Sequence, residues 1–257
     1  MKIWYQSYVD LENGATYWEH LRKNLNAAMS PGTTVDIHGI TPYDSYAHPL
    51  VEFRCAREMI ANVVKAEREG YDAVVVGHFQ DAGLYEARSV VDIPVIGLGE
   101  ATMLWCCQLG QRLGIVTINP RFIPWFHQQI GKYGLRDRVT GVHSLSFEPG
   151  QILGAYGDEE KAIEVKGLFD KQAEPLVEQG IDVVIPGGGI PMVLFSQFQN
   201  HNVGGAPVIN GIPIALKMAE MAVSLKQLTG QSVSRTGDYV KAPPEVIEEF
   251  LTHPKGL

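Results

Sequence analysis

Short unbroken apolar runs alternate along this chain with longer segments in which apolar residues recur every three or four positions. The first pattern is typical of parallel strands covered on both faces, and the second is typical of helices. The predicted strands are Lys2–Tyr8, Thr34–His38, Ala73–Val76, Val95–Gly97, Gly114–Ile118, Val139–His143, Val183–Ile185 and Val208–Ile209. The predicted helices are Tyr17–Ala28, Val51–Glu69, Gly83–Val90, Ala101–Leu109, Ile123–Tyr133, Glu159–Gln179, Pro191–Phe198 and Ile214–Leu228. Strands and helices that alternate in this way predict an α/β protein built on parallel sheets.

One stretch of sequence occurs twice, at residues 72–97 and 182–210. Each copy has an aspartate, a buried apolar run, a glycine turn, a segment of helix length and a second run that follows a proline. The repeat predicts two pseudo-symmetric lobes, each a four-stranded parallel sheet with helices on both faces. An eightfold β/α barrel is the rival interpretation, but the repeat and the short chain favour two lobes. The first lobe is expected to comprise residues 1–105 and 212–230, the second lobe residues 106–211, and a C-terminal arm residues 231–257.

Composition narrows the partners that we expect. The chain has 257 residues, 45% of them hydrophobic and 19% charged, as is ordinary for a globular protein. The net charge is -8 and the basic residues are scattered, which argues against nucleic acid and anionic membrane as partners. The expected partner is instead a small molecule.

Cysteine usage and the amino terminus suggest where the protein resides. Cys55, Cys106 and Cys107 lack metal-ligand spacing and are expected to be reduced thiols. The chain begins with a strand-like run rather than a signal-peptide pattern, and no run reaches membrane-spanning length. A cytoplasmic location is therefore expected.

The two copies of the repeat differ at one chemically important position. In parallel α/β sheets, ligands bind beyond the carboxyl ends of the strands, so the turns after the strands are the place to search. Six residues after the aspartate, the first copy has His78 and the second has Gly188. One turn therefore offers an imidazole, and the other offers only backbone.

Several motifs resemble the Asp/Glu/hydantoin racemase superfamily, nearest its hydantoin racemase branch. They are GHFQDAGL at 77–84, IPVIGLGEA at 93–101, LGIVT at 113–117, GGG at 187–189 and PVING at 207–211. The resemblance implies two pseudo-symmetric α/β lobes with the active site between them. In that family a cysteine normally occupies each repeated turn. Here His78 stands at the first position and Gly188, or Gly189 within the same glycine run, at the second.

These replacements favour acid/base chemistry from one side of the substrate. Imidazole can act as base or acid near neutral pH, whereas glycine can only present backbone N–H groups to an oxygen. The expected reaction is an isomerisation, decarboxylation, elimination or hydrolysis next to a carbonyl. Its substrate would be a small carboxylate or a hydantoin-like cyclic amide, with no cofactor. Two alternatives stay open, a non-catalytic small-molecule-binding protein and a true hydantoin or amino-acid racemase with a non-cysteine acid/base pair.

Further residues are candidates because they follow predicted strands. Asp81 could orient His78 as a second catalytic residue, or it could cap the helix that begins near Gly83. The expected substrate-binding residues are Gln6, Ser7, Tyr43, His48, Thr117, Asn119, Gly187, Gly188 and Gly189. In this set Thr117 and Asn119 would complete an oxygen cradle with the three glycines.

The remaining polar candidates carry weaker expectations. Glu148 and His48 would be the next acid/base candidates if His78 were not used. A metal site formed by His78 and Asp81 with His48 or His143 is the competing interpretation, but no metal is expected because a strong ligand motif is missing. His201 falls in a loop at the opposite end of the strands. The arm after Gly230 is expected to pack on a lobe or on a neighbouring subunit and to support a homo-oligomer.

Overall fold

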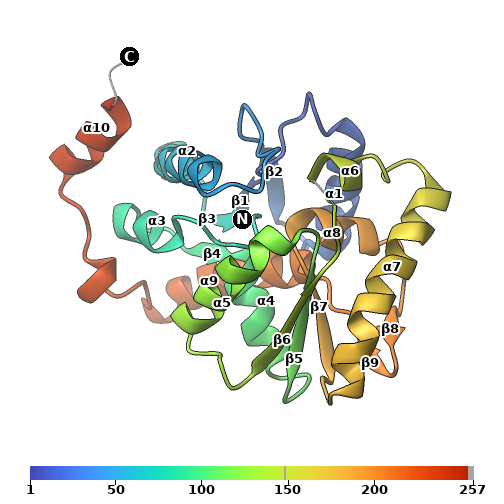
Figure 1. Cartoon of the computed structure of the whole chain (residues 1–257). Helices are drawn as coiled ribbons and strands as arrows, with labels where there is room; N and C mark the ends of the chain where they lie inside the picture. The colour runs from blue at the N-terminus through green and yellow to red at the C-terminus, as the bar shows by residue number, and fades with distance from the viewer. Residues whose placement is uncertain (148, 254–257) are drawn as a thin grey trace.

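The computed structural model describes residues 1–147 and 149–253, which form two parallel sheets flanked by helices (Figure 1). The α/β class predicted from the sequence is thereby confirmed. In the first sheet the strand order is β2-β1-β3-β4, and all neighbouring strands are parallel. Its strands are β1 (Lys2–Gln6), β2 (Thr34–His38), β3 (Ala73–Val76) and β4 (Val95–Gly97).

The second sheet repeats this order with one strand fewer. It runs β6-β5-β7, from β5 (Leu113–Thr117), β6 (Val139–Ser144) and β7 (Val183–Gly187). The predicted fourth strand at 208–209 is reduced to a single parallel bridge between Val184 and Val208. The reason is local: residues just before it form a small hairpin of β8 (Asn202–Val203) and β9 (Ala206–Pro207), and Asn210 just after it already caps a helix.

Helices cover both sheets. Those that follow the first-sheet strands are α1 (Ala15–Ala28), α2 (Pro49–Arg68), α3 (Leu84–Val90) and α4 (Leu98–Cys106). Those that follow the second-sheet strands are η1 (Pro120–Phe122), α5 (Ile123–Lys132), α6 (Pro149–Leu153), α7 (Glu159–Glu178), α8 (Gly189–Phe195) and α9 (Gly211–Thr229). The last of these, α9, returns to contact β3 and β4 as well as α1 and α4. The proposed lobe boundaries stay a prediction.

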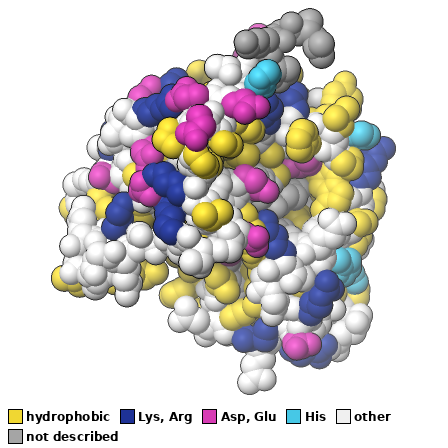
Figure 2. Space-filling view, turned by 90° about the vertical axis from the view of Figure 1, so that its left-hand side faces the viewer, with side chains coloured by type: hydrophobic (Ala, Val, Ile, Leu, Met, Phe, Trp, Pro, Cys, Tyr) yellow, Lys and Arg dark blue, Asp and Glu magenta, His cyan; other side chains and the backbone are white. Residues whose placement is uncertain are grey.

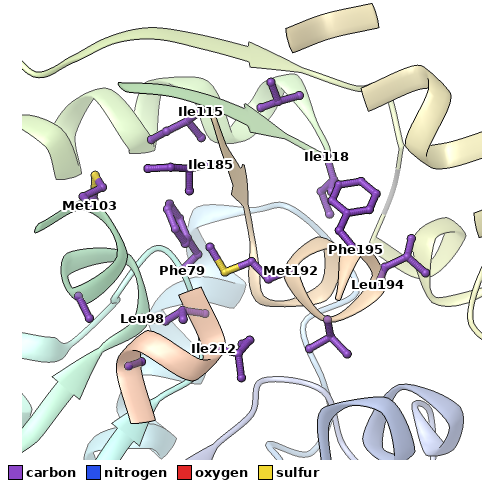
Figure 3. Packing of buried hydrophobic residues seen from close by; sticks show 14 of the residues in the cluster. Phe79, Leu98, Met103, Ile115, Ile118, Ile185, Met192, Leu194, Phe195 and Ile212 are labelled. Atoms are coloured by element: carbon purple, nitrogen blue, oxygen red, sulfur yellow. The ribbon is translucent and has the colours of Figure 1, made fainter. Parts of the chain in front are cut away.

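One hydrophobic cluster joins the two lobes. Phe79, which directly follows His78, is fully buried and lies beside Ile115 and Ile185 of the second sheet (Figure 3). Its ring meets that of Phe126 on α5 edge to face, with 5.4 Å between centroids. Because aromatic and branched side chains from both lobes interlock here, the turn that carries His78 is held against the second lobe.

The described part of the C-terminal arm packs on the first lobe. It contains η2 (Gly237–Tyr239) and α10 (Pro244–Thr252), and Figure 1 shows it running past α3 toward α2. Arg235 donates hydrogen bonds to the backbone oxygens of Arg88 and Val91, while Phe250 packs on the cluster beneath α2. On the face that Figure 2 shows, acidic and basic side chains are interspersed with apolar ones. No helix in residues 1–147 and 149–253 is long and apolar enough to cross a membrane.

Candidate active site

A cavity of about 510 Å³, its open mouth included, lies where the two repeated glycine turns face each other. Gly77 and His78 from the end of β3 form one wall, and the run from Gly187 to Pro191 at the start of α8 forms the opposite wall. The remaining lining residues are Tyr8, Val9, Tyr17, Asp44, Gln80, Ile118 and Phe122. No Lys or Arg occurs among these described lining residues, so His78 is their one basic side chain.

The imidazole of His78 is held by two residues that precede it in the sequence. Its Nε2 lies 2.8 and 2.9 Å from the two carboxylate oxygens of Glu52, in the first turn of α2. Its ring stacks on that of Tyr8, with 4.0 Å between centroids and 4° between planes. The Tyr8 hydroxyl in turn donates to the backbone oxygen of Ala82. Glu52 therefore holds one edge of the imidazole, and Tyr8 covers one face of it.

These contacts leave Nδ1 as the nitrogen for chemistry. Among the described residues Nδ1 of His78 has no hydrogen-bond partner, and it is not one of the fully enclosed polar atoms. Because Glu52 accepts a hydrogen bond from Nε2–H, the neutral imidazole keeps its lone pair on Nδ1. In this tautomer Nδ1 of His78 is a base rather than a donor.

Asp44 joins His78 and Glu52 to form a cluster of three titratable groups. Asp44 lines the cavity, and its carboxylate accepts a hydrogen bond from the backbone N–H of Tyr46 at 3.1 Å. Burial raises the pKa of Asp44, and the charge of Glu52 adds to the rise while His78 opposes it. Burial and the neighbouring carboxylate thus both favour the protonated form of Asp44, whereas His78 favours its ionised form.

The same cluster sets the protonation of His78. Burial works to lower the pKa of His78, but the charge and hydrogen bond of Glu52, together with the charges of Asp44 and Asp81, outweigh it. The pKa of His78 consequently lies above its ordinary value. An imidazole in this range can take up or return a proton near neutral pH.

Asp81 does not orient His78. Its carboxylate accepts hydrogen bonds from the backbone N–H groups of Gly99 and Glu100, at 3.1 and 2.7 Å, and so caps the start of α4. It also accepts from Gln129 and Tyr133 on α5, at 3.0 and 2.8 Å. The expected helix cap is thus present, but at α4 rather than at the helix that begins near Gly83. Burial raises the pKa of Asp81 to about 6, against these four hydrogen bonds.

The polar residues that end β1 and β5 serve the fold around the cavity. The Thr117 hydroxyl donates to the backbone oxygen of Gly187 at 2.9 Å, which ties β5 to the glycine run. Asn119 caps η1 by accepting from Arg121 N–H and donates to the backbone oxygen of Phe147. Gln6 bonds to the backbone oxygens of Ser7 and His38, and Ser7 accepts from Val9 N–H. None of these four side chains lines the cavity in the described part of the chain.

The glycine run is needed for backbone geometry. Gly188 has φ +156°, a conformation that L side chains rarely adopt, and its N–H donates to the backbone oxygen of Pro186. A Cβ on Gly189 would lie 2.6 Å from the backbone oxygen of Gly77, so the two turns touch at this point. The first-turn N–H groups of Gly189 and Ile190 come too early in α8 to find an acceptor within it. These two groups, rather than that of Gly188, can meet an oxygen in the cavity.

The other described sequence candidates do not line the cavity. His48 is exposed, and its Nδ1 caps α2 by accepting from Leu50 N–H. Tyr43 is half-buried in the loop before α2, and Glu148 lies outside the described residues. His201 pairs with Asp170 at 2.7 Å, away from the cavity that His78 lines. Within residues 1–147 and 149–253, no three His, Cys, Asp or Glu side chains come together as a metal-binding group.

Glu52, Asp44 and Tyr8 are the site residues that sequence reasoning missed. Glu52 did not stand out as a site residue, because an acidic residue in the first turn stabilises any helix. The pattern predicts Tyr8 as the last residue of a strand and places Asp44 in a polar loop, and neither position indicates a site. The one available signal was that this loop and the end of the first strand lie at the same edge of the sheet as His78.

The structure is thus that of an α/β protein of two lobes, with a histidine–carboxylate pair at the cavity between the repeated turns. The chain belongs to the Asp/Glu/hydantoin racemase family, whose model matches residues 11–219. The sequence is 31% identical to hydantoin racemase of Pseudomonas sp. (strain NS671) over 173 residues, 67% of each chain. It is 28% identical to hydantoin racemase of Rhizobium meliloti over 182 residues, 70% of each chain. The fold is similar to that of allantoin racemase from Klebsiella pneumoniae, with a TM-score of 0.77, 23% identity and coverage of 95% of this chain and 94% of that one. The family resemblance predicted from the motifs is therefore confirmed.

Proposed function

We propose that this chain is a cofactor-independent enzyme that moves a proton at a carbon next to a carbonyl, with His78 as its acid/base. The observation that carries the proposal is the His78–Glu52 pair at the cavity wall, which holds Nε2 and leaves Nδ1 without a hydrogen-bond partner among the described residues. A base in this setting removes the acidic proton, and the resulting enolate oxygen needs hydrogen-bond donors. The N–H groups of Gly189 and Ile190 supply them from the opposite wall.

The preferred substrate is a hydantoin-like cyclic amide with an apolar substituent. The described lining residues offer no Lys or Arg to neutralise a carboxylate, and Val9, Ile118, Phe122 and Ile190 give an apolar wall. An uncharged ring loses less on leaving water than a dicarboxylate does. The hydantoin racemase relatives agree with this preference. The reaction itself is expected to be one-sided, an isomerisation, decarboxylation, elimination or hydrolysis, because Gly188 carries no protonic side chain.

The test is a panel of 5-substituted hydantoins, allantoin, arylmalonates and dicarboxylates in D2O. Mass, optical rotation and deuterium uptake at the acidic carbon are followed together for the parent, His78→Ala and the exposed control His127→Ala. Turnover is expected to fall by roughly two to four powers of ten in His78→Ala, the usual worth of a positioned acid/base, and to be unchanged in the control. Equal loss of optical rotation from both enantiomers would favour a true racemase with a second acid/base. Tight binding without any turnover would instead establish a non-catalytic binding protein.

A further inference from the structure

The hydrogen bonds to Glu52 restrain the imidazole of His78 incompletely. Nε2 lies 2.8 and 2.9 Å from the two carboxylate oxygens of Glu52. Hydrogen bonds tolerate a broad range of angles, and rotation of a histidine ring about its Cβ–Cγ bond is soft. A partner at Nε2 therefore leaves the ring some freedom to turn, and every turn swings Nδ1. Another contact has to fix the direction of Nδ1.

Tyr8 provides this second restraint. Its ring lies parallel to the imidazole of His78, with 4.0 Å between centroids and 4° between planes. Any turn of the imidazole out of this plane would press one edge of it against the tyrosine ring. Tyr8 is itself held in place, because it is buried in the cluster beneath α2 and its hydroxyl donates to the backbone oxygen of Ala82 at 3.3 Å. One face of His78 is thus covered by a ring that is anchored.

The same stack affects the charge of His78. The face of an aromatic ring attracts a cation placed over it, so the Tyr8 ring favours imidazolium over imidazole. This effect adds to that of three carboxyl groups, on Glu52, Asp44 and Asp81. Burial works to lower the pKa of His78, and the charges of these groups outweigh it. Tyr8 itself stays neutral, because burial raises its pKa well above the ordinary value. Removal of the Tyr8 ring should therefore make His78 a weaker base.

We propose that Tyr8 is a positioning residue for His78, whose ring keeps Nδ1 in one direction and stabilises the imidazolium that forms on proton transfer. This role rests on the proposed function of His78. Tyr8 also lines the cavity, so the alternative is a residue that only contacts the substrate. The two roles predict different kinetics. A positioning residue changes kcat and the pH dependence, whereas a contact made equally in the ground and transition states changes KM.

Two variants separate the ring from its hydroxyl. Tyr8→Phe keeps the stacked ring, and Tyr8→Leu removes it. Both are compared with the parent by steady-state kinetics on the same hydantoin panel and by NMR titration of the His78 ring nitrogens in the ligand-free protein. In Tyr8→Leu, kcat should fall roughly ten- to a hundredfold while KM changes little. His78 should titrate roughly 0.4–1.5 pH units lower in this variant. Tyr8→Phe should remain close to the parent in both measurements.

Tyr46→Leu is the matched control. It makes the same change on a side chain that is 67% exposed and does not line the cavity, so its rates and titration should match the parent. Thermal unfolding shows whether each variant is folded. If Tyr8→Leu is not, pentafluorophenylalanine in place of Tyr8 keeps the shape of the ring but reverses the potential of its face. His78 should then still titrate lower than in Tyr8→Phe.

The outcomes separate this proposal from the one on which it rests. It is overturned if Tyr8→Leu keeps the parental kcat or changes only KM, since that result describes a substrate contact. It is also overturned if Tyr8→Phe loses as much turnover as Tyr8→Leu, because the hydroxyl and not the stack would then be responsible. If the parent turns over no member of the panel, the proposed function of His78 fails. The NMR titration still decides the stack: an unchanged midpoint in Tyr8→Leu overturns its effect on His78, and a lowered midpoint supports it.

Discussion

The two nitrogens of His78 have different neighbours, and this difference assigns their chemistry. Glu52 binds Nε2, whereas Nδ1 has no hydrogen-bond partner among the described residues. The turn on the opposite wall has no side chain at Gly188, and its φ of +156° leaves little room for one. The two copies of the repeat therefore differ at His78 and Gly188 in backbone conformation as well as in residue type.

The pH dependence of turnover follows from the pKa of His78. A base must be unprotonated, so kcat/KM should rise with pH through the pKa of His78, which lies above its ordinary value. Glu52→Gln removes the main charge that opposes burial, so the rise should move to lower pH. Rates measured from pH 5 to 9 for both proteins check this. The parent and variant would have the same profile if Glu52 did not set this pKa.

Gly188→Ala should impair both stability and turnover. The new Cβ would lie 2.9 Å from Cδ of Pro191, in a conformation that costs a non-glycine residue roughly 1–3 kcal/mol. Thermal unfolding and steady-state rates measure the two effects, and Gly167→Ala, on α7 with open space around its Cβ, is the control. Parental stability together with parental turnover would show that the turn adapts freely.

At the scale of secondary-structure elements, Asp81 connects three of them. Its carboxylate caps α4 and accepts hydrogen bonds from Gln129 and Tyr133 on α5, so it joins the first lobe to the second. Phe79 reinforces the same junction through the shared hydrophobic cluster (Figure 3). The sequence left two roles open for Asp81, orienting His78 or capping the helix near Gly83, and the cap at α4 with partners on α5 depends on how the lobes pack.

Tyr133→Phe should weaken this junction by about 1.5–3 kcal/mol, the usual worth of a hydrogen bond to a charged group. The loss should depend on pH. Because burial raises the pKa of Asp81 to about 6, its contribution to stability is full below its ordinary pKa and is lost as pH rises through about 6. The Tyr133 hydroxyl helps the ionised carboxylate, so the variant should lose more stability at pH 8 than at pH 5.

Denaturant unfolding of Tyr133→Phe at the two pH values measures this difference. Tyr46→Phe, on a side chain that is 67% exposed, is the matched control. An equal loss at both pH values would mean that the hydroxyl does not interact with an ionised Asp81.

At the scale of the whole molecule, the C-terminal arm returns to the first lobe. It covers α3 and part of α2, which places it on the outside of the lobe that carries His78 (Figure 1). The partly buried Ile247, Phe250 and Leu251 join the apolar cluster there. The prediction that the arm packs on a lobe is confirmed, and its role in a homo-oligomer stays a prediction.

Truncation after Gly230 should lower the free energy of unfolding by roughly 2–5 kcal/mol, since partly buried apolar side chains and the Arg235 hydrogen bonds are lost. The exposed ion pair between Arg68 and Glu248 contributes little to this sum, so Arg68→Ala is the control. Thermal unfolding measures the loss, and light scattering on the same samples tests the predicted homo-oligomer. A truncated chain of unchanged stability would show that the arm is only loosely attached.

Features that depend on neighbouring residues could be predicted from the amino-acid pattern. Apolar periodicity predicted the strands and helices, and the repeat predicted the two sheets and the turn that carries His78. The tertiary structure alone decided which groups meet. Glu52 reaches His78 across 26 positions of sequence, and Asp81 reaches α5 across 48. It also reduced the strand predicted at 208–209 to one bridge. Periodicity records which face of an element is buried, whereas a pairing between distant side chains follows from how whole elements pack, and no local pattern encodes that.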